Sequence, residues 1–428
     1  MSCRVLLVVS TLLFTFPVAL PAGAAGAGDQ IAVAPADWAW WRGPNRNGVA
    51  AEGQTPPLEW SAEKNVLWKT AVPGRGYGSP TVVGDRIFLA TADEAAEIQA
   101  VRCYDRNTGQ ELWSTDIHQG GFASVGRPGH VRSSKASSTV ACDGERVFIN
   151  FINDNAVYLT ALSVTGEKLW QQKVSDYVMH QGYGASPALY AGLVIVSVDH
   201  HGGGVVAAYD RTTGERAWSN KRPENPNYTS PIILNIDGRD QVVLVGCDRI
   251  ASYDPLTGAV NWEAEGATTE CVTSTVTDGQ YVVTSGGYPS KHISVVRGDG
   301  SGEVLWRNET QVYVPSMLIR GGHLYAVTDN GEALCYELAT GNLAWEHRLR
   351  DKFAASPVLV GDLIYATGDS GTTFIYKASP AGFAPVAENT LAADEVQATP
   401  VICGSRIYMR QATGRGEARQ EMLYCIGM

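Results

Sequence analysis

The hydrophobic and polar positions of the chain repeat one short arrangement. A run rich in β-branched and aromatic residues ends at a turn, a Thr-Gly or Ser-Gly pair follows, and a tryptophan comes shortly afterwards. A glycine supplies the positive φ that such a turn needs, so each copy predicts a β-hairpin with the tryptophan on its second strand. We expect these large rings to be largely buried between neighbouring repeats. The copies are YDRNTGQELW (104–113), LSVTGEKLW (162–170), DRTTGERAW (210–218), DPLTGAVNW (254–262), GDGSGEVLW (298–306) and ELATGNLAW (337–345).

A second signal sets the register of the repeat. Eight times the chain opens a short apolar run at a Ser or Thr, with spacings between 40 and 58 residues. Strand-only repeats of about forty residues indicate a β-propeller. The sequence therefore predicts an all-β fold, an eight-bladed propeller of four-stranded blades. The openings are Ser79-Pro80, Ser137-Ser138, Ser186-Pro187, Ser230-Pro231, Thr273-Ser274, Ser316-Met317, Ser356-Pro357 and Thr399-Pro400.

The two ends of the repeat region complete each other. Residues 65–70 (NVLWKT) resemble a tryptophan strand without a blade before it, and the chain ends at residues 423–428 (LYCIGM) where a tryptophan strand should follow. We expect residues 65–71 to supply the outer strand of the last blade, because this removes an open sheet edge. Residues 58–428 then form one closed domain, which we expect to be a monomer.

The first 57 residues lie outside the repeat. Residues 1–27 have the charge, apolar core and small-residue end of a cleaved signal peptide, which predicts a periplasmic or secreted protein that does not span the membrane. No cysteine stands at the cleavage site, so no lipid anchor is expected there. Residues 28–57 are rich in tryptophan. We expect this segment to cap the side or one face of the propeller, and stacking on a ligand is the alternative.

Charge and cysteine content narrow the possible partners. The net charge of −11 argues against a nucleic-acid partner, because phosphate binding needs a basic face. Outside the signal peptide there are seven cysteines, an odd number without a C-x-x-C pair. We interpret them as small buried hydrophobic residues rather than a disulfide framework.

Candidate binding residues fall on one face. We name as the top face the side that carries the connections between blades and the loops between second and third strands, and as the bottom face the opposite side. Six of the eight histidines map to top-face loops, which supports a binding surface at the channel mouth, although long polar loops are the alternative explanation. A metal site from Asp199, His200 and His201 with His130 or His180 is chemically feasible, but adjacent histidines rarely both ligate one ion, so we do not expect it. The candidate ligand-binding residues are Tyr77, His130, Arg132, Lys135, His180, Tyr183, His200, His201 and Tyr228.

These cationic and aromatic side chains suit a small anionic or sugar-like ligand, or an acidic segment of a protein partner. No catalytic motif is present: the sequence contains no G-x-S-x-G, no G-x-x-x-x-G-K-[ST] and no H-E-x-x-H. We therefore name no catalytic residue and expect no metal.

The repeat Y-D-x-x-T-G-x-x-x-W followed by S-P-x-V-x-G-D-x-I-Y resembles the repeat of pyrroloquinoline-quinone-like (PQQ-like) propellers over about residues 58–428. That family includes quinoprotein dehydrogenases and the outer-membrane assembly lipoprotein BamB. The resemblance implies the fold. The chain lacks the adjacent Cys-Cys pair of the dehydrogenases, and no acidic residue stands out at the expected channel-mouth positions, which include Cys271 and Val314. We therefore expect a BamB-like binding module without a cofactor, and a dehydrogenase using PQQ and calcium is the alternative.

Overall fold

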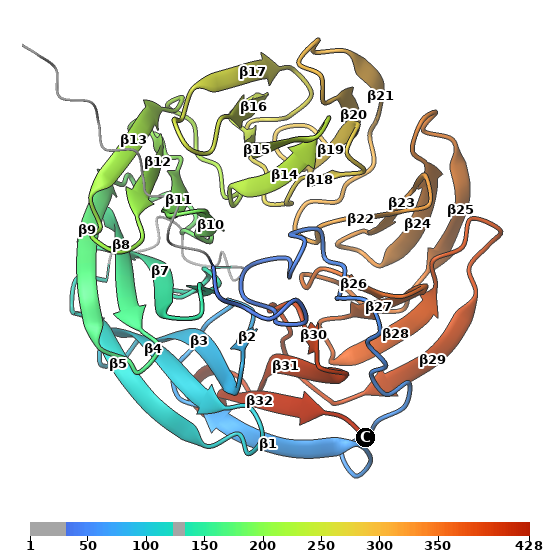
Figure 1. Ribbon diagram of the computed structural model, residues 1–428. Coiled ribbons are helices and arrows are strands. Elements are labelled where there is room, and N and C mark those ends of the chain that lie inside the picture. The colour runs from blue at the N-terminus through green and yellow to red at the C-terminus, as the bar shows by residue number, and fades with distance from the viewer. Residues whose placement is uncertain (1–30, 123–132) are drawn as a thin grey trace, which may run out of the picture.

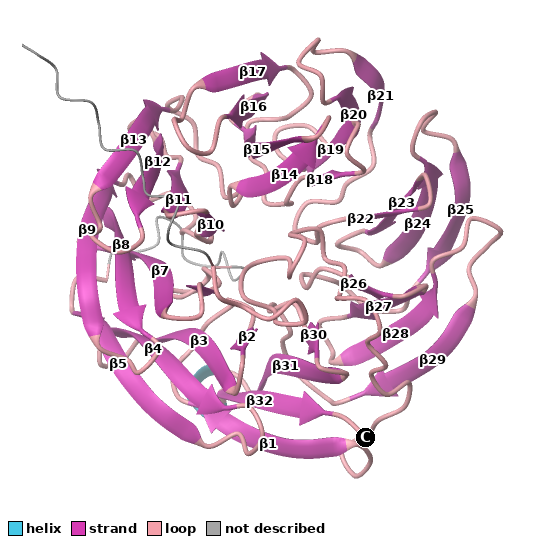
Figure 2. Ribbon diagram, viewed as in Figure 1, coloured by secondary structure: helices cyan, strands magenta, loops and turns pink. Residues whose placement is uncertain are grey.

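The computed structural model describes residues 31–122 and 133–428, and it is a ring of eight four-stranded antiparallel sheets around a central channel (Figure 1). The predicted all-β, eight-bladed propeller is thus confirmed. Strands and loops make up almost all of the ring, and the described part contains one short 3-10 helix, Gly416–Ala418 (Figure 2).

Each blade runs from an inner strand at the channel to an outer strand at the rim. Blade 1 contains β2 (Thr81–Val83), β3 (Arg86–Asp93), β4 (Ile98–Asp105) and β5 (Glu111–Gln119). Blade 2 contains β6 (Ala141–Cys142), β7 (Arg146–Asn153), β8 (Ala156–Ser163) and β9 (Lys168–Asp176). Blade 3 contains β10 (Ala188–Tyr190), β11 (Leu193–Val198), β12 (Val205–Asp210) and β13 (Arg216–Lys221). Blade 4 contains β14 (Ile232–Ile236), β15 (Arg239–Gly246), β16 (Arg249–Tyr253) and β17 (Val260–Ala264).

The second half of the ring repeats this order until the last blade. Blade 5 contains β18 (Val276–Thr277), β19 (Tyr281–Gly286), β20 (His292–Arg297) and β21 (Val304–Asn308). Blade 6 contains β22 (Leu318–Arg320), β23 (His323–Val327), β24 (Glu332–Glu337) and β25 (Leu343–Arg348). Blade 7 contains β26 (Val358–Val360), β27 (Leu363–Thr367), β28 (Thr372–Lys377) and β29 (Pro385–Thr390). Blade 8 contains β30 (Val401–Cys403), β31 (Arg406–Thr413), β32 (Gln420–Ile426) and β1 (Val66–Val72).

Blade 8 closes the ring with strands from both ends of the repeat region, as the sequence predicts. Strand β1 pairs antiparallel with β32, with Lys69 opposite Tyr424 and Thr70 opposite Leu423. The backbone N–H of Gly427 also donates to the carbonyl of Asn65 at 2.9 Å. The edge of β32 is therefore covered within the same molecule.

The repeated tryptophans hold neighbouring blades together. The indole N–H of Trp218 in blade 3 donates to the carbonyl of Pro255 in blade 4 at 3.1 Å, and its ring covers the turn glycine Gly258. Trp262 instead donates to the Gln241 side chain of its own blade at 2.9 Å. The same hydrogen bond, from an indole N–H to a backbone carbonyl of the next blade, recurs in five other pairs. These are Trp68–Arg106, Trp113–Val164, Trp170–Arg211, Trp306–Leu338 and Trp345–Ser379.

The six predicted rings are largely buried, to different degrees. Trp218 and Trp262 are buried, with 8% and 7% of their surface exposed. The other four predicted rings, Trp113, Trp170, Trp306 and Trp345, are half-buried. These four rings are less buried because the outer strands lie at the rim, where each indole packs on the next blade.

The tryptophan-rich N-terminal segment crosses the bottom face and enters the channel, where it lies at the centre of the ring in Figure 1. We call residues 31–60 the plug. Trp38 exchanges two backbone hydrogen bonds with Val82 of β2, and the backbone N–H of Ala50 donates to Leu359 of β26 at 2.8 Å. The segment packs across one face of the propeller, as expected, because the plug pairs with the inner-strand edges of blades 1 and 7, which lie on either side of blade 8.

One fully buried arginine fastens the plug to two blades. The Arg42 guanidinium donates to the carbonyl of Met317 at 2.6 Å and to that of Pro357 at 3.4 Å, and 1% of the residue is exposed. Burial lowers the pKa of Arg42 to about 9. Backbone carbonyls that face the channel need hydrogen-bond donors where water is excluded. The planar guanidinium group supplies several N–H donors.

Three further sequence expectations concern other parts of the chain. The predicted signal peptide, residues 1–27, lies outside the described residues. The seven cysteines of the described chain are buried and free. Within the described ranges, no helix has the length and apolar character required to cross a bilayer.

Candidate functional site

A ring of Ser and Thr hydroxyls surrounds the channel at the start of the inner strands. In seven of the eight junctions, the backbone N–H of one ring residue donates to the hydroxyl oxygen of the next, at 2.8–3.0 Å. At the remaining junction the indole N–H of Trp41, from the plug, donates to Ser274 Oγ at 2.7 Å. The ring residues are Ser79, Thr139, Ser186, Ser230, Ser274, Ser316, Ser356 and Thr399.

The Ser or Thr openings found in the sequence include the ring residue in seven blades and miss it in one. In blade 2 the ring position is Thr139, and not the Ser137-Ser138 pair that the sequence pattern indicated. The Ser138 hydroxyl donates instead to the carbonyl of Ala185. The pattern was misleading here because three hydroxyl residues follow one another, and spacing cannot distinguish which of them faces the channel.

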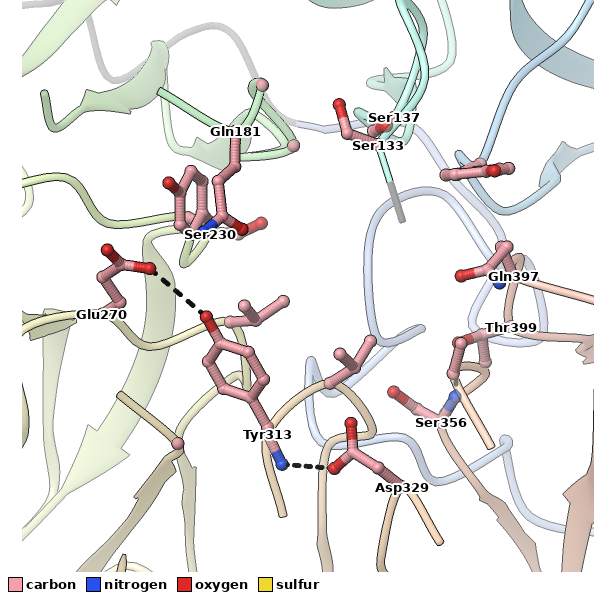
Figure 3. A pocket seen from close by; sticks show the side chains of 18 of the residues that line it. Ser133, Ser137, Gln181, Ser230, Glu270, Tyr313, Asp329, Ser356, Gln397 and Thr399 are labelled. Carbon is pink, nitrogen blue, oxygen red and sulfur yellow. Dashed lines mark hydrogen bonds between the residues drawn. The ribbon is translucent and has the colours of Figure 1, made fainter. Parts of the chain in front are cut away.

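A cavity of about 720 Å³ lies above the ring, with Trp41 of the plug among its lining residues. Every blade or the connection leading into it contributes to the wall, and Figure 3 shows the polar side chains that face the space. Hydroxyl and amide groups predominate among the polar residues. They include Ser79, Ser133, Ser137, Thr139, Gln181, Ser186, Ser230, Gln311, Asn330, Ser356, Gln397 and Thr399.

Two carboxylates lie on one wall of the cavity, on either side of Tyr313 (Figure 3). The Tyr313 hydroxyl donates to Glu270 Oε2 at 3.4 Å, and its backbone N–H donates to Asp329 Oδ2 at 2.7 Å. Glu270 and Asp329 are 3% and 5% exposed. Burial, followed by the Glu270 charge, raises the pKa of Tyr313 and of the neighbouring Tyr228 well above that of an ordinary phenol. Both phenols are therefore neutral at physiological pH.

Three predicted site residues, Tyr77, Tyr183 and Tyr228, line the cavity. The Tyr77 hydroxyl donates to Glu395 at 2.7 Å. The Tyr183 hydroxyl donates to the carbonyl of Ser197 at 2.9 Å. Their rings are thus held in place by partners outside the cavity. Their binding of a ligand remains a prediction.

The predicted cationic residues are placed differently. His180 lies behind the wall, 3.0 Å from the Tyr228 hydroxyl and 3.7 Å from Glu270, and the exposed His201 packs on its ring. Lys135 lies beside a separate small pocket, with its ammonium group 5.7 Å from the centre of the Phe122 ring.

His200 is buried within its own loop. Its Nδ1 accepts the backbone N–H groups of Val178 and Gly202, each at 3.1 Å, so this imidazole organises the loop. The predicted site residues His130 and Arg132 lie outside the described residues.

His118, one of the top-face histidines noted in the sequence, has a structural role. It lies near the end of β5, where its Nδ1 is 3.0 Å from Gln99 Oε1 and its Nε2 is 3.1 Å from Gln171 Nε2. The Gln99 amide nitrogen donates to the carbonyls of Lys135 and Ile152, which directs its oxygen at the imidazole. His118 Nδ1 therefore carries the proton and Nε2 accepts. Burial, assisted by Lys168, lowers the pKa of His118 to about 4.

We expect acid to destabilise the protein partly through His118. The unfolded chain binds a proton at this residue below about pH 6.5, whereas the folded chain resists protonation until about pH 4, so stability falls as the pH decreases through that window and levels off below it. Urea unfolding of His118→Gln between pH 7 and pH 4 should show a smaller loss than the parent. His323→Gln, at the turn between β22 and β23, is the control, and equal slopes for all three proteins would contradict the prediction.

The acidic residues of the cavity were not predicted from the sequence. No acidic residue stands at the expected channel-mouth positions, but Glu270 and Asp329 both line the cavity. Glu270 precedes the expected position Cys271 by one residue, and Asp329 comes from the β23–β24 loop rather than from a connection between blades. Among the described residues, no group of three or more His, Cys, Asp or Glu side chains is arranged to hold a metal ion.

Comparison with known proteins identifies the family. A family profile described as outer membrane protein assembly factor BamB matches residues 97–345 and 290–382. The chain is 25% identical over 384 residues to the outer membrane protein assembly factor BamB of Burkholderia pseudomallei (strain K96243), which covers 84% of this chain and 89% of that protein. It is 23% identical over 318 residues to the protein of the same description from Bordetella pertussis, covering 71% and 73%.

Solved structures share the fold. BamB from Moraxella catarrhalis superposes with a TM-score of 0.59 at 14% identity, covering 84% of this chain and 96% of that chain. A europium-containing methanol dehydrogenase superposes with a TM-score of 0.66 at 12% identity, covering 92% and 98%. At these identities the structures establish the architecture alone. Since the family profile covers more than half of the sequence, the chain belongs to the BamB family of PQQ-like β-propellers.

Proposed function

We propose that this propeller is a periplasmic or secreted binding scaffold, and that a segment of a protein partner enters its central cavity from the top face. One observation carries the proposal: a cavity of about 720 Å³ is lined from around the whole ring, and the chain's own plug lies at its bottom end. Concave sites with a few convergent polar groups are the usual binding sites of proteins. The relatives' description as outer membrane protein assembly factors supports a partner in that process.

The alternative, a PQQ-dependent dehydrogenase, fits the residues less well. The cavity wall carries Glu270 and Asp329, but its described residues include no cysteine. The nearby Cys271 is buried and free, so the lining offers no pair of sulfurs to stack on a quinone. The tyrosines are held by structural hydrogen bonds. This donor set favours binding without a cofactor.

The test is to fill the cavity. Gln397 projects into it, so Gln397→Trp should obstruct entry while leaving the blades intact (Figure 3). We expect the purified parent protein to retain a specific partner from the envelope fraction of its source bacterium, and Gln397→Trp to lose it. Gln280→Trp, at an exposed turn of the bottom face, is the matched control and should retain the partner. Equal retention by all three proteins would contradict binding in the cavity.

A separate measurement addresses the alternative. The absorbance spectrum of the protein is recorded with added PQQ and calcium, and dye reduction is followed with alcohols and sugars as substrates. Stoichiometric quinone binding with calcium-dependent dye reduction would establish the dehydrogenase instead of the scaffold. A folded protein that shows neither result supports the proposal.

A further inference from the structure

The hydroxyl ring at the floor of the cavity is a set of hydrogen-bond donors. Six of its eight members line the cavity, and the hydroxyl oxygen of each accepts a backbone N–H of the neighbouring ring residue at 2.8–3.0 Å. A hydroxyl that accepts one hydrogen bond still carries its own hydrogen, which it can donate to a second partner. The six are Ser79, Thr139, Ser186, Ser230, Ser356 and Thr399.

These six hydroxyl groups donate to no acceptor within the part of the chain that the structure describes. All are buried, with exposed fractions between 2% for Ser356 and 7% for Ser230. Other buried hydroxyls near the floor differ, since those of Thr81 and Ser138 each donate to a backbone carbonyl. Buried polar groups normally satisfy their hydrogen-bonding capacity, so unused donors that converge on one cavity indicate a ligand that supplies acceptors.

The plug covers the remainder of the hydroxyl ring. The Trp41 indole donates to Ser274, and the Arg42 guanidinium donates to the carbonyl of Met317, the residue after Ser316. Ser274 and Ser316 are the two ring members that do not line the cavity. The open donors therefore form one continuous arc, from Ser356 of blade 7 through blades 8, 1, 2 and 3 to Ser230 of blade 4. Figure 3 shows its two ends on opposite sides of the cavity.

Resting on the proposed function, we infer that the bound segment of the partner presents backbone carbonyls to this arc, as an uncharged loop or extended chain end. The carbonyls inside a helix or a paired strand already accept an N–H of their own chain, whereas those of a loop or an extended end are open to an outside donor. Among the lining residues that the structure describes there is no Lys or Arg. Neutral carbonyl oxygens therefore fit these donors at a lower cost than a buried carboxylate, which needs a cationic partner.

The test of the ligand chemistry uses three small probes in isothermal titration. Acetyl-tetraglycine amide carries backbone carbonyls and N–H groups, and acetyl-tetrasarcosine dimethylamide keeps the carbonyls but has no N–H. We expect both peptides to bind, with dissociation constants within about ten-fold of each other, and maltotetraose to bind more weakly than either. Binding of the glycine peptide alone, or of neither peptide, would overturn the inference. Tighter binding of maltotetraose would overturn it in favour of a sugar.

Variants of the hydroxyl ring locate the binding. Ser356→Ala and Thr399→Val each remove one donor of the arc, so each should weaken binding of the sarcosine peptide by about three- to ten-fold. Ser316→Ala is the matched control, because Ser316 is 1% exposed and accepts the backbone N–H of Ser274 at 3.0 Å but does not line the cavity. It loses the same structural hydrogen bond and should bind the peptide as tightly as the parent.

Circular dichroism establishes that each variant is folded, and either arc variant alone suffices if the other does not fold. Parental affinity in a folded arc variant would overturn the inference, as would equal weakening in Ser316→Ala.

The two proposals fail in different ways. If Gln397→Trp abolishes retention of a partner while Ser356→Ala and Thr399→Val do not weaken it, the cavity binds a protein segment without contacts from its carbonyls to the arc, and the inference is wrong. If Gln397→Trp retains the partner, the proposed function itself is wrong, whatever the small probes show.

Discussion

A chain that begins at Gly74 should not fold into a stable propeller. It lacks β1, so β32 would expose a complete edge, and it also lacks the plug, which contributes Trp38 and Trp60 to the core cluster between blades 7, 8 and 1. Loss of both removes the backbone pairs of β1 and several buried rings. We expect the stabilising free energy lost with them to exceed the total stability of about 5–15 kcal/mol that is usual for a folded domain. We expect no cooperative thermal unfolding transition for this fragment.

Adding the missing residues as a separate peptide tests whether their loss is what prevents folding. A peptide of residues 31–73, supplied in trans, should restore the near-ultraviolet circular dichroism and the unfolding transition of the fragment that begins at Gly74, because it provides β1 and the plug together. The matched control is a chain that begins at Ile31, which should unfold at nearly the same temperature as the parent. A fragment from Gly74 that melts within a few degrees of the parent would show that blade 8 is stable with three strands.

The fold was predictable because each blade repeats the same local chemistry. The Thr-Gly turn, the tryptophan and the hydroxyl at the start of the inner strand recur at regular spacing, so eight weak signals reinforce one another. Ring closure was predictable for the same reason, since Trp68 appears without its blade and Cys425 without its tryptophan strand. These two residues are indeed partners in the β1–β32 ladder.

The site was less predictable because its acidic residues recur in only some blades. Glu270 and Asp329 belong to different kinds of loop, and an acidic counterpart stands at the equivalent position of another blade for each, Glu395 and Asp369, so the repeat pattern alone does not single out the pair that lines the cavity. Histidine content was misleading in a different way. His118, His200 and His292 map to top-face loops, but His200 and His292 are buried, and His118 and His200 form hydrogen bonds with their own surroundings, His118 with Gln99 of β4 and His200 with the backbone of its loop. Buried polar side chains that form hydrogen bonds with their neighbours are of the same residue types as those of a binding site, so residue type alone does not distinguish the two.

The turn glycines should be among the positions least tolerant of substitution. Gly258 has a φ of +73°, and a Cβ there would lie 2.6 Å from the ring of Trp218. Gly258→Ala should therefore lower the free energy of unfolding in two ways. The left-handed backbone conformation costs an alanine roughly 1–2 kcal/mol, and the steric overlap with Trp218 costs about 1–3 kcal/mol more. Gly238, in the same blade, has a φ of +74° and no atom within 4 Å of its Cβ position. Gly238→Ala is thus a matched control that carries the backbone cost alone.

Combining the glycine and tryptophan substitutions separates the two contributions. Trp218→Ala removes a buried ring and the hydrogen bond to Pro255, and should cost roughly 3–5 kcal/mol in urea unfolding. In the Trp218→Ala background the overlap at Gly258 no longer exists, so Gly258→Ala should cost about the same as Gly238→Ala, roughly 1–2 kcal/mol. If Gly258→Ala instead costs the same with and without Trp218, the ring does not press on the turn, and the contact between blades 3 and 4 is weaker than its geometry indicates.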